Sequence, residues 1–296
     1  MCGIVGLFLK NSELEPELGR LTAAMLTCMC ARGPDSAGFA IYSDSRKGFI
    51  KLTLRGPAGT NFSDLSAPLV KTIKDVETTV HDSHAVLNVR QGSEKLVLEW
   101  LAREAPYIDV VGRGLRMELY KEVGWPETVV RRFDLPAMRG THAIGHTRMA
   151  TESAVTIDGA HPYSTGIDQC LVHNGSLSNH NGVRRILSRE GFAFETENDT
   201  EVAAGYLTWR MRQGLTLGEA LKASLDDLDG FYTFVVGTEN GFGVLRDGIA
   251  CKPAVMAETN CYVAFGTEYR ALAGLPGVAG ARIFEPDPAT VYFWER

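Results

Sequence analysis

The apolar residues at the start of the chain come in short blocks. Each block is bounded by glycine or polar residues, which is typical of strands buried on at least one face. The blocks are residues 3–9, 37–43 and 48–54. Between the first two, apolar side chains recur at helical spacing up to Cys28, and the pair Ser12/Glu15 has the spacing of a capping box. The pattern therefore predicts a strand, a helix and two further strands.

The second half of the chain shows strand and helix patterns in alternation. Strands are predicted at 143–147, 169–173, 231–237, 241–246, 261–266 and 290–294, and helices at 182–190, 200–212 and 217–228. The last of these helices begins with a second capping box, Thr216 with Glu219, and carries leucines on one face. Many strands with a few segregated helices predict an α+β fold of layered sheets covered by helices.

Residues 55 to about 140 look like an extension of this plan. The first part, 56–68, is rich in Gly, Pro and Ser and is predicted to be a loop. A strand pattern at 84–89 and a helical pattern as far as Leu101 follow it. No repeat, low-complexity tract or linker divides the chain. We therefore expect one domain over residues 1–296 with an inserted extension at 55–140.

Composition excludes several classes of protein. The 296 residues are 45% hydrophobic and 22% charged, which is typical of a folded globular protein. The formal net charge is −6 and no basic cluster is longer than a pair, so no nucleic-acid partner is expected. The apolar runs are far too short for a membrane span and no signal-peptide pattern opens the chain, so we expect no membrane association and a cytoplasmic location.

The six cysteines are sparse for this length, and free thiols in a reducing compartment are expected. Cys2 differs from the others in its position. Removal of Met1 would leave a thiol and a free α-amino group on the same residue. Because an α-amino group has a pKa of about 7.7–8.0, it can accept the proton of its own thiol near neutral pH. On this feature alone, Cys2 is either a nucleophile or a residue near a frayed terminus.

Four later segments carry polar groups suited to an active site: residues 32–38, 145–151 with His161 beyond it, 173–179 and 198–201. Arg148 could bind a carboxylate with two hydrogen bonds, and Asp199 could bind an ammonium group. Each segment also has an ordinary structural explanation. Arg148 could pair with a surface carboxylate, residues 174–175 are an Asn-Gly turn signal, and Asp199 is a good helix N-cap.

In this order after Met-Cys-Gly, the four segments resemble the class II glutamine amidotransferase (glutaminase) family. Further segments resemble later parts of that family: 228–230, 246–247, 252–253 and 266–268. The resemblance covers nearly the whole chain and implies a four-layer αββα sandwich of the N-terminal-nucleophile hydrolase type. It also implies hydrolysis of glutamine to glutamate and ammonia through a thioester on Cys2.

The resemblance implies the residues of catalysis. Cys2 would be the nucleophile, with its own α-amino group as general base. The Asn174 side chain and the Gly175 N–H would form the oxyanion hole, and Arg32 and Gly33 would support the nucleophile. Two donors at the amide oxygen are what a tetrahedral intermediate requires.

The resemblance also implies the residues that bind substrate. Arg148 would bind the α-carboxylate of glutamine and Asp199 its α-ammonium group, while Thr151 and His161 would line the pocket. Glutamine is a zwitterion with a neutral amide at its far end, so one cation and one anion are the minimum set for selecting it.

Residues 84–132 resemble stand-alone amidotransferase subunits of glutamate synthase-like systems, N-methylglutamate synthase in particular. No synthase domain follows residue 296, so we expect the ammonia to pass to separate chains. The resemblance implies an FMN-binding synthase subunit and a glycine-repeat subunit as partners. FMN, and any iron–sulfur cluster, would belong to those partners, and no cofactor or metal is expected in this chain.

Three alternatives remain open. The chain could be a stand-alone γ-glutamyl amidase, or a non-catalytic assembly subunit that keeps the fold and retains Met1. Metal binding is a third alternative, because His142 and His146 are four residues apart with His161, Cys170 and His173 following. The segment reads as a strand, however, where an i, i+4 pair would not converge on one ion as it does on a helix.

Overall fold

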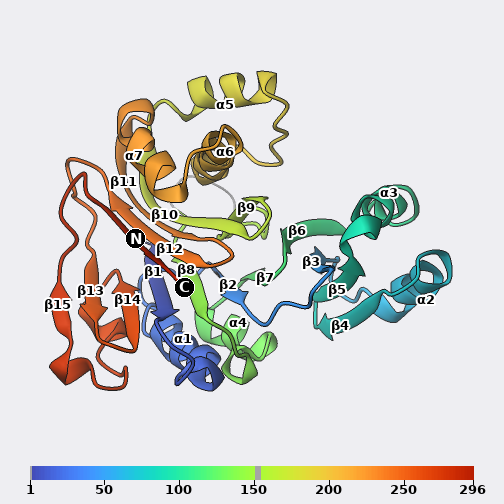
Figure 1. Cartoon of the computed structure of the whole chain (residues 1–296), viewed down its shortest axis with the longest axis horizontal. Helices are drawn as coiled ribbons and strands as arrows, with labels where there is room; N and C mark the ends of the chain where they lie inside the picture. The colour runs from blue at the N-terminus through green and yellow to red at the C-terminus, as the bar shows by residue number, and fades with distance from the viewer. Residues whose placement is uncertain (1, 151–154) are drawn as a thin grey trace.

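The computed structural model describes residues 2–150 and 155–296. Within these residues the strands form three sheets (Figure 1). The large sheet has the order β15 (Arg282–Phe284), β13 (Val255–Glu258), β14 (Tyr262–Gly266), β1 (Gly3–Leu9), β8 (His142–Arg148), β2 (Ser36–Tyr42) and β7 (Met117–Val123). The second sheet has the order β16 (Val291–Glu295), β12 (Gly241–Arg246), β11 (Gly230–Gly237), β10 (Gln169–Leu177) and β9 (Tyr163–Gly166). The satellite sheet has the order β4 (Glu77–His81), β5 (His84–Arg90), β3 (Phe49–Arg55) and β6 (Asp109–Gly114).

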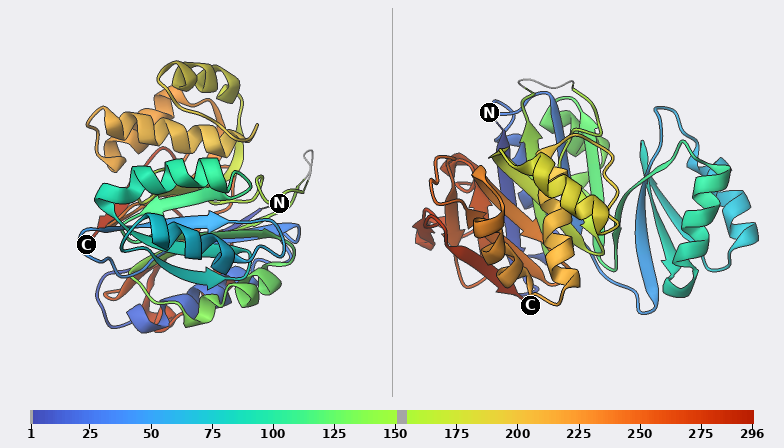
Figure 2. Two further views of the ribbon diagram at one scale, coloured as in Figure 1. Left: turned by 90° about the vertical axis from the view of Figure 1, so that its right-hand side faces the viewer. Right: turned by 90° about the horizontal axis from the view of Figure 1, so that it is seen from above.

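The helices lie outside the large and second sheets, which face each other. Helices α1 (Leu18–Thr27) and α4 (Pro126–Arg132) cover the large sheet, while α6 (Asp199–Arg212) and α7 (Leu217–Asp227) cover the second sheet (Figures 1 and 2). Helix α5 (His180–Arg189) packs on α6. This arrangement confirms the predicted α+β fold with layers in the order α, β, β, α. No helix in the described part of the chain has the length and apolarity that a membrane crossing needs.

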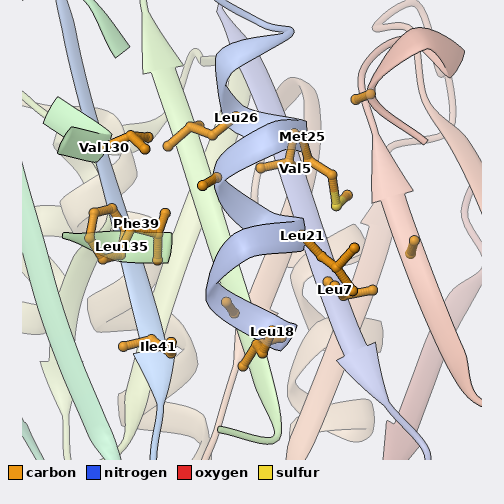
Figure 3. Close-up of a cluster of buried hydrophobic side chains, with 14 of the residues drawn as sticks. Val5, Leu7, Leu18, Leu21, Met25, Leu26, Phe39, Ile41, Val130 and Leu135 are labelled. Carbon is orange, nitrogen blue, oxygen red and sulfur yellow. The ribbon is translucent and has the colours of Figure 1, made fainter. Parts of the chain in front are cut away.

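Strand β1 shows why its apolar run is continuous. Val5 and Leu7 point to one face and pack with Leu21 of α1 in a buried core (Figure 3). Phe8 points to the other face, where its ring lies 6.2 Å from that of Phe242 between the two sheets. Side chains alternate between the faces of a strand, so a strand in the middle of four layers needs apolar residues at every position.

One of the two predicted capping boxes is present. Thr216 and Glu219 exchange side-chain to backbone hydrogen bonds at the start of α7, as predicted. The prediction at Ser12 and Glu15 is wrong, because Glu15–Glu17 form a 3-10 turn and α1 begins at Leu18 without a side-chain cap. The Leu18 N–H donates to the Glu15 carbonyl and the Gly19 N–H to the Met138 carbonyl (3.1 Å), so backbone oxygens take the place of a side-chain cap.

The satellite sheet and its two helices occupy residues 49–114. The element order is β3, α2 (Phe62–Thr72), β4, β5, α3 (Glu94–Glu104) and β6, which is a split βαβ unit that stands beside the layered body in Figure 1. The loop predicted at 56–68 is wrong from Phe62 onward, because Asn61 caps α2 and Pro68 lies inside that helix. By contrast, β7 and α4 belong to the large sheet and its cover, so the interval 55–140 contains elements of both bodies.

Candidate active site

The backbone after Cys2 is fixed at the start of β1. The Ile4 N–H donates to Thr267 Oγ1 (2.8 Å), and the Thr267 N–H donates to the Ile4 carbonyl (2.9 Å). On its other side, Gly3 pairs with Thr147 of β8. Strands on both sides therefore hold the start of β1, while Cys2 itself stays partly exposed.

Two predicted site residues converge on Cys2. Arg32 donates from Nε to the Cys2 carbonyl oxygen (3.1 Å), and Asn174 donates to the same oxygen from Nδ2 (3.3 Å). The Arg32 guanidinium also pairs with Glu268, with 2.6 Å between Nη1 and Oε1. These contacts join the loop after α1, strand β10 and the loop after β14 around the same residue.

Gly33 permits the close approach of that loop to β8. A Cβ atom at this position would lie 2.4 Å from the carbonyl carbon of Thr147 and 2.5 Å from the Arg148 nitrogen. The Asp35 carboxylate accepts from the Ala150 N–H (2.8 Å), and the Asp35 N–H donates to the Arg148 carbonyl (3.1 Å). The segment that carries Arg32 is thus bonded to the end of β8.

Asn174 and Gly175 lie inside β10. The turn that an Asn-Gly pair often signals does not form here, because the strand continues to Leu177 and pairs with β11. Gly175 has a φ of +151°, and a Cβ there would lie 1.9 Å from the Phe231 carbonyl oxygen. The neighbouring strand supplies the pairing that keeps the chain extended, and only glycine fits this backbone conformation.

Arg148 and Asp199 line one cavity of about 550 Å³. The described residues around it also include Thr156, Asp158, Gly159, His180 and 195–198. Cys2 and Asn174 are not among them. Strand β10 runs from Cys2 to this cavity. Its Asn174 contacts Cys2 and, farther along, its Leu177 N–H donates to Asp199 Oδ2 (2.9 Å). Thr151 lies outside the described residues.

Asp199 is the first residue of α6 and is anionic near neutral pH. The N-cap is Asn198, whose Oδ1 accepts from the Thr200 N–H (2.8 Å), so the alternative explanation of Asp199 as an N-cap does not hold. Burial opposes ionisation of Asp199, but its contact with His173 and the hydrogen bond from the Leu177 N–H outweigh burial and lower the pKa to about 2. A partly exposed carboxylate at the start of a helix, in one cavity with an arginine, suits a zwitterion.

His161 does not line this cavity. Its side chain is buried, and its ring stacks on His146 with 4.0 Å between the ring centroids. Burial, together with the neighbouring positive groups, lowers the pKa of His161 well below its usual value. The ring is therefore neutral, and it lies against His146 and 3.4 Å from Thr200 Oγ1.

Sequence reasoning did not identify His173, Thr200, Thr267 or Glu268 as parts of the site. His173 lies 3.5 Å from Asp199 through Nδ1, and Glu268 holds Arg32. Two of the four directly precede or follow predicted site residues, which is the signal that could have found them. The contacts of Thr267 and Glu268 join segments far apart in the chain and cannot be seen as spacing.

The residues considered for metal binding have other contacts. In residues 2–150 and 155–296, no three His, Cys, Asp or Glu side chains come together as metal ligands. His142 bonds the Thr238 carbonyl (2.9 Å) and His146 the His173 carbonyl (3.1 Å), each through Nε2. Burial lowers the pKa of both histidines to about 3.

Comparison with known proteins places these features in a family. A family model described as a glutamine amidotransferase domain matches residues 146–274. The glutamine amidotransferase-like protein GlxB of Rhizobium meliloti is 60% identical over 100% of this chain and 98% of its own length. A putative glutamine amidotransferase of Methanothermobacter thermautotrophicus is 33% identical over 99% of both chains. The chain belongs to the class II glutamine amidotransferase family.

Solved structures show the same fold for this amidotransferase. The glutamine phosphoribosylpyrophosphate amidotransferase from B. subtilis superposes with a TM-score of 0.63 at 20% identity. The match covers 99% of this chain and 47% of that structure, so this amidotransferase spans about half its length. The layered body of sheets and helices is therefore the N-terminal-nucleophile hydrolase fold.

Proposed function

We propose that this amidotransferase hydrolyses glutamine to glutamate and ammonia through a thioester on Cys2. The observation that carries the proposal is the convergence of Arg32 and Asn174 on Cys2, with β10 leading from there to Asp199 and the cavity it shares with Arg148. A nucleophile at one end and a pair of opposite charges at the other suit a zwitterion with a distal amide.

The chemistry begins after loss of Met1. The Cys2 α-amino group takes the thiol proton, and the sulfur attacks the amide carbon of glutamine. The Asn174 amide and the Gly175 N–H stabilise the oxyanion, ammonia leaves with the transferred proton, and a γ-glutamyl thioester remains. Water then attacks the thioester, which releases glutamate and restores the thiol. An asparagine amide has two N–H donors, so Asn174 can keep its bond to the Cys2 carbonyl while facing the oxyanion.

Substrate selection follows from the two charges in the cavity. Arg148 binds the α-carboxylate and Asp199 the α-ammonium group, and the lowered pKa of Asp199 keeps it charged across the physiological range. A substrate that lacks either charge loses one of these two charged contacts, which weakens its binding.

The ammonia goes to a synthase partner in this proposal. Residues 84–132 resemble stand-alone subunits of glutamate synthase-like and N-methylglutamate synthase systems, which supports a cytoplasmic hetero-oligomer with ammonia channelling. The FMN-binding synthase subunit and the glycine-repeat subunit would carry FMN and any iron–sulfur cluster, and this chain would hold no cofactor. Flavin bound to the isolated chain would contradict this part.

The test is covalent labelling by a diazoketone that mimics glutamine. We expect the natively expressed chain to lack Met1 and to gain one adduct, which peptide mapping places on Cys2. Cys2→Ser should abolish the adduct, while Cys28→Ser, which changes an exposed cysteine, should leave it unchanged. A chain that retains Met1, or one that lacks it and stays unlabelled with its partners present, would support the assembly-only alternative. Turnover without partners and preference for an N-substituted γ-amide would support the γ-glutamyl amidase.

A further inference from the structure

Behind the proposed glutamine site, Thr200 lies where three polar side chains meet. It is the second residue of α6 and only 1% exposed. Its Oγ1 lies 3.1 Å from His173 Nδ1, 3.4 Å from His161 Nε2 and 3.4 Å from Asp199 Oδ1. The hydroxyl thus contacts the segment before β9, strand β10 and the carboxylate at the start of α6.

The valences of these groups fix the direction of each hydrogen bond. An ionised carboxylate only accepts, so Thr200 donates its single proton to Asp199. The two lone pairs of the hydroxyl then accept from His161 Nε2–H and His173 Nδ1–H, and its bonding capacity is filled. The other nitrogens of these rings, His161 Nδ1 and His173 Nε2, are buried without a hydrogen-bond partner among the described residues. Each ring therefore has one bonded nitrogen, and that nitrogen faces Thr200.

The same network reaches the strands that carry Arg148 and Asn174. His146, two residues before Arg148, stacks on His161 and bonds the His173 carbonyl at 3.1 Å. His173 directly precedes Asn174, whose amide contacts Cys2. Asp199 is thus tied in two ways to the strand that carries the oxyanion residue, directly by the Leu177 N–H and through Thr200 and His173.

We propose that the Thr200 hydroxyl, with His161 and His173, is a positioning group that fixes the Asp199 carboxylate relative to Asn174. It sets the separation between the ammonium-binding end and the amide-binding end of the site, and it touches no substrate itself. This inference rests on the proposed glutaminase function, because it assigns the support of two residues of that site.

The test compares two reagents that label Cys2. The glutamine-like diazoketone carries the ammonium group that Asp199 would hold, whereas iodoacetamide reacts with the same thiol and has no ammonium group. Thr200→Val keeps the shape of the side chain and removes its hydroxyl. We expect the second-order rate of diazoketone labelling to fall about ten-fold, the effect of one lost bond to a charged group, while the iodoacetamide rate stays within about two-fold.

Matched variants separate positioning from general loss of structure. Thr200→Ser restores the hydroxyl and should recover the diazoketone rate. Thr208→Val removes another buried hydroxyl of α6, which bonds Gln169 (2.9 Å) outside the network, and should leave both rates unchanged. If Thr200→Val does not fold, His161→Phe must show the same selective loss, because it keeps a ring beside His146 and removes Nε2.

The outcomes are distinct. The positioning role would be overturned if Thr200→Val lowered the labelling rates of both reagents equally. It would also be overturned if Thr200→Val or His161→Phe kept the wild-type rate of diazoketone labelling. A wild-type chain that iodoacetamide labels and the diazoketone does not would contradict the proposed glutamine site itself, and the inference with it.

Discussion

The Asn174 amide reaches residue 2 from 172 positions away in the sequence, and it is only 5% exposed when it does so. At the scale of single residues, the site consists of a few polar groups held by bonds of this kind. Arg32 is fixed by Glu268, and Asp199 by the Leu177 N–H. Substitutions at such positions should change either kcat or the free energy of unfolding, and the two effects can be measured separately.

Asn174→Ala should leave glutamine binding near normal and reduce kcat by about 10²–10³-fold, because one oxyanion donor is lost. Steady-state ammonia release measures this. Asn179→Ala is the matched control, since that side chain bonds Asp227 and Asp229 backbone atoms instead of the site. Near-normal kcat in Asn174→Ala would contradict the oxyanion assignment.

Gly33→Ala should lower the free energy of unfolding by about 1–3 kcal/mol, because its Cβ would meet backbone atoms of Thr147 and Arg148 that cannot easily move. Urea unfolding measures this. Gly218→Ala is the control, because its Cβ meets no atom within 4 Å and alanine favours the helix. Equal stability of the two variants would show that the loop before β2 adjusts freely.

At the scale of elements, sequence patterns located most of the long strands and helices, but they missed α2, β7 and several short strands. The strand predicted at 143–147 is one residue shorter than β8 at each end, and the helix predicted at 200–212 begins one residue after α6 does. Strands β13 and β15 were not predicted, because four and three residues are too few to show a period of two. In the tertiary structure β13 pairs with β14, and β15 pairs with β13, and this pairing makes them strands.

The start of α6 predicts a pH dependence. The pKa of Asp199 is lowered to about 2 in the folded chain, below the unfolded reference of about 3.9, so its stabilisation is present above pH 4 and is lost as the pH falls through 2. Wild type should therefore lose about 2 kcal/mol relative to Asp199→Asn between pH 5 and pH 2. Urea unfolding at several pH values measures the difference. The free energy of unfolding of Asp226→Asn, a change at an exposed position, should vary with pH in parallel with that of wild type. If the curve for Asp199→Asn is also parallel to that of wild type, it would contradict the lowered pKa.

At the scale of the whole molecule, charged pairs connect the satellite sheet to the layered body, beside apolar contacts of Val86 and Val111. Lys51 of β3 pairs with Glu118 of β7 at 2.6 Å, with the side chains 10% and 15% exposed. Burial opposes ionisation of Glu118, but the charge and hydrogen bond of Lys51 outweigh it and lower the pKa. Arg55 of the same strand pairs with Asp158, which lines the cavity of Arg148 and Asp199.

Lys51→Met should destabilise the chain by about 3–5 kcal/mol, because it leaves the buried Glu118 carboxylate without a positively charged partner. The double variant Lys51→Met/Glu118→Leu should recover most of this loss, since it replaces the whole pair by apolar groups. Denaturant unfolding measures both. Arg20→Met, which breaks the exposed pair with Glu17, should cost less than about 1 kcal/mol. A double variant as unstable as the single one would show that the junction needs the charges themselves.

The sequence by itself determined the layered α+β fold and the family. Apolar runs of strand length, helical spacing and motif order are local properties, and they remain readable without contacts. Cys2, Arg32 and Asn174 were predicted as one site from the family resemblance, and the structure brings them together.

Only the tertiary structure decided the rest. The Asn-Gly pair at 174–175 is a turn signal in isolation, and pairing with β11 keeps it extended. His161 is buried against His146 instead of lining the cavity, and Thr200 joins three groups from different segments. These outcomes depend on which neighbours each residue meets after folding, and contacts between distant segments leave no spacing in the chain from which to predict them.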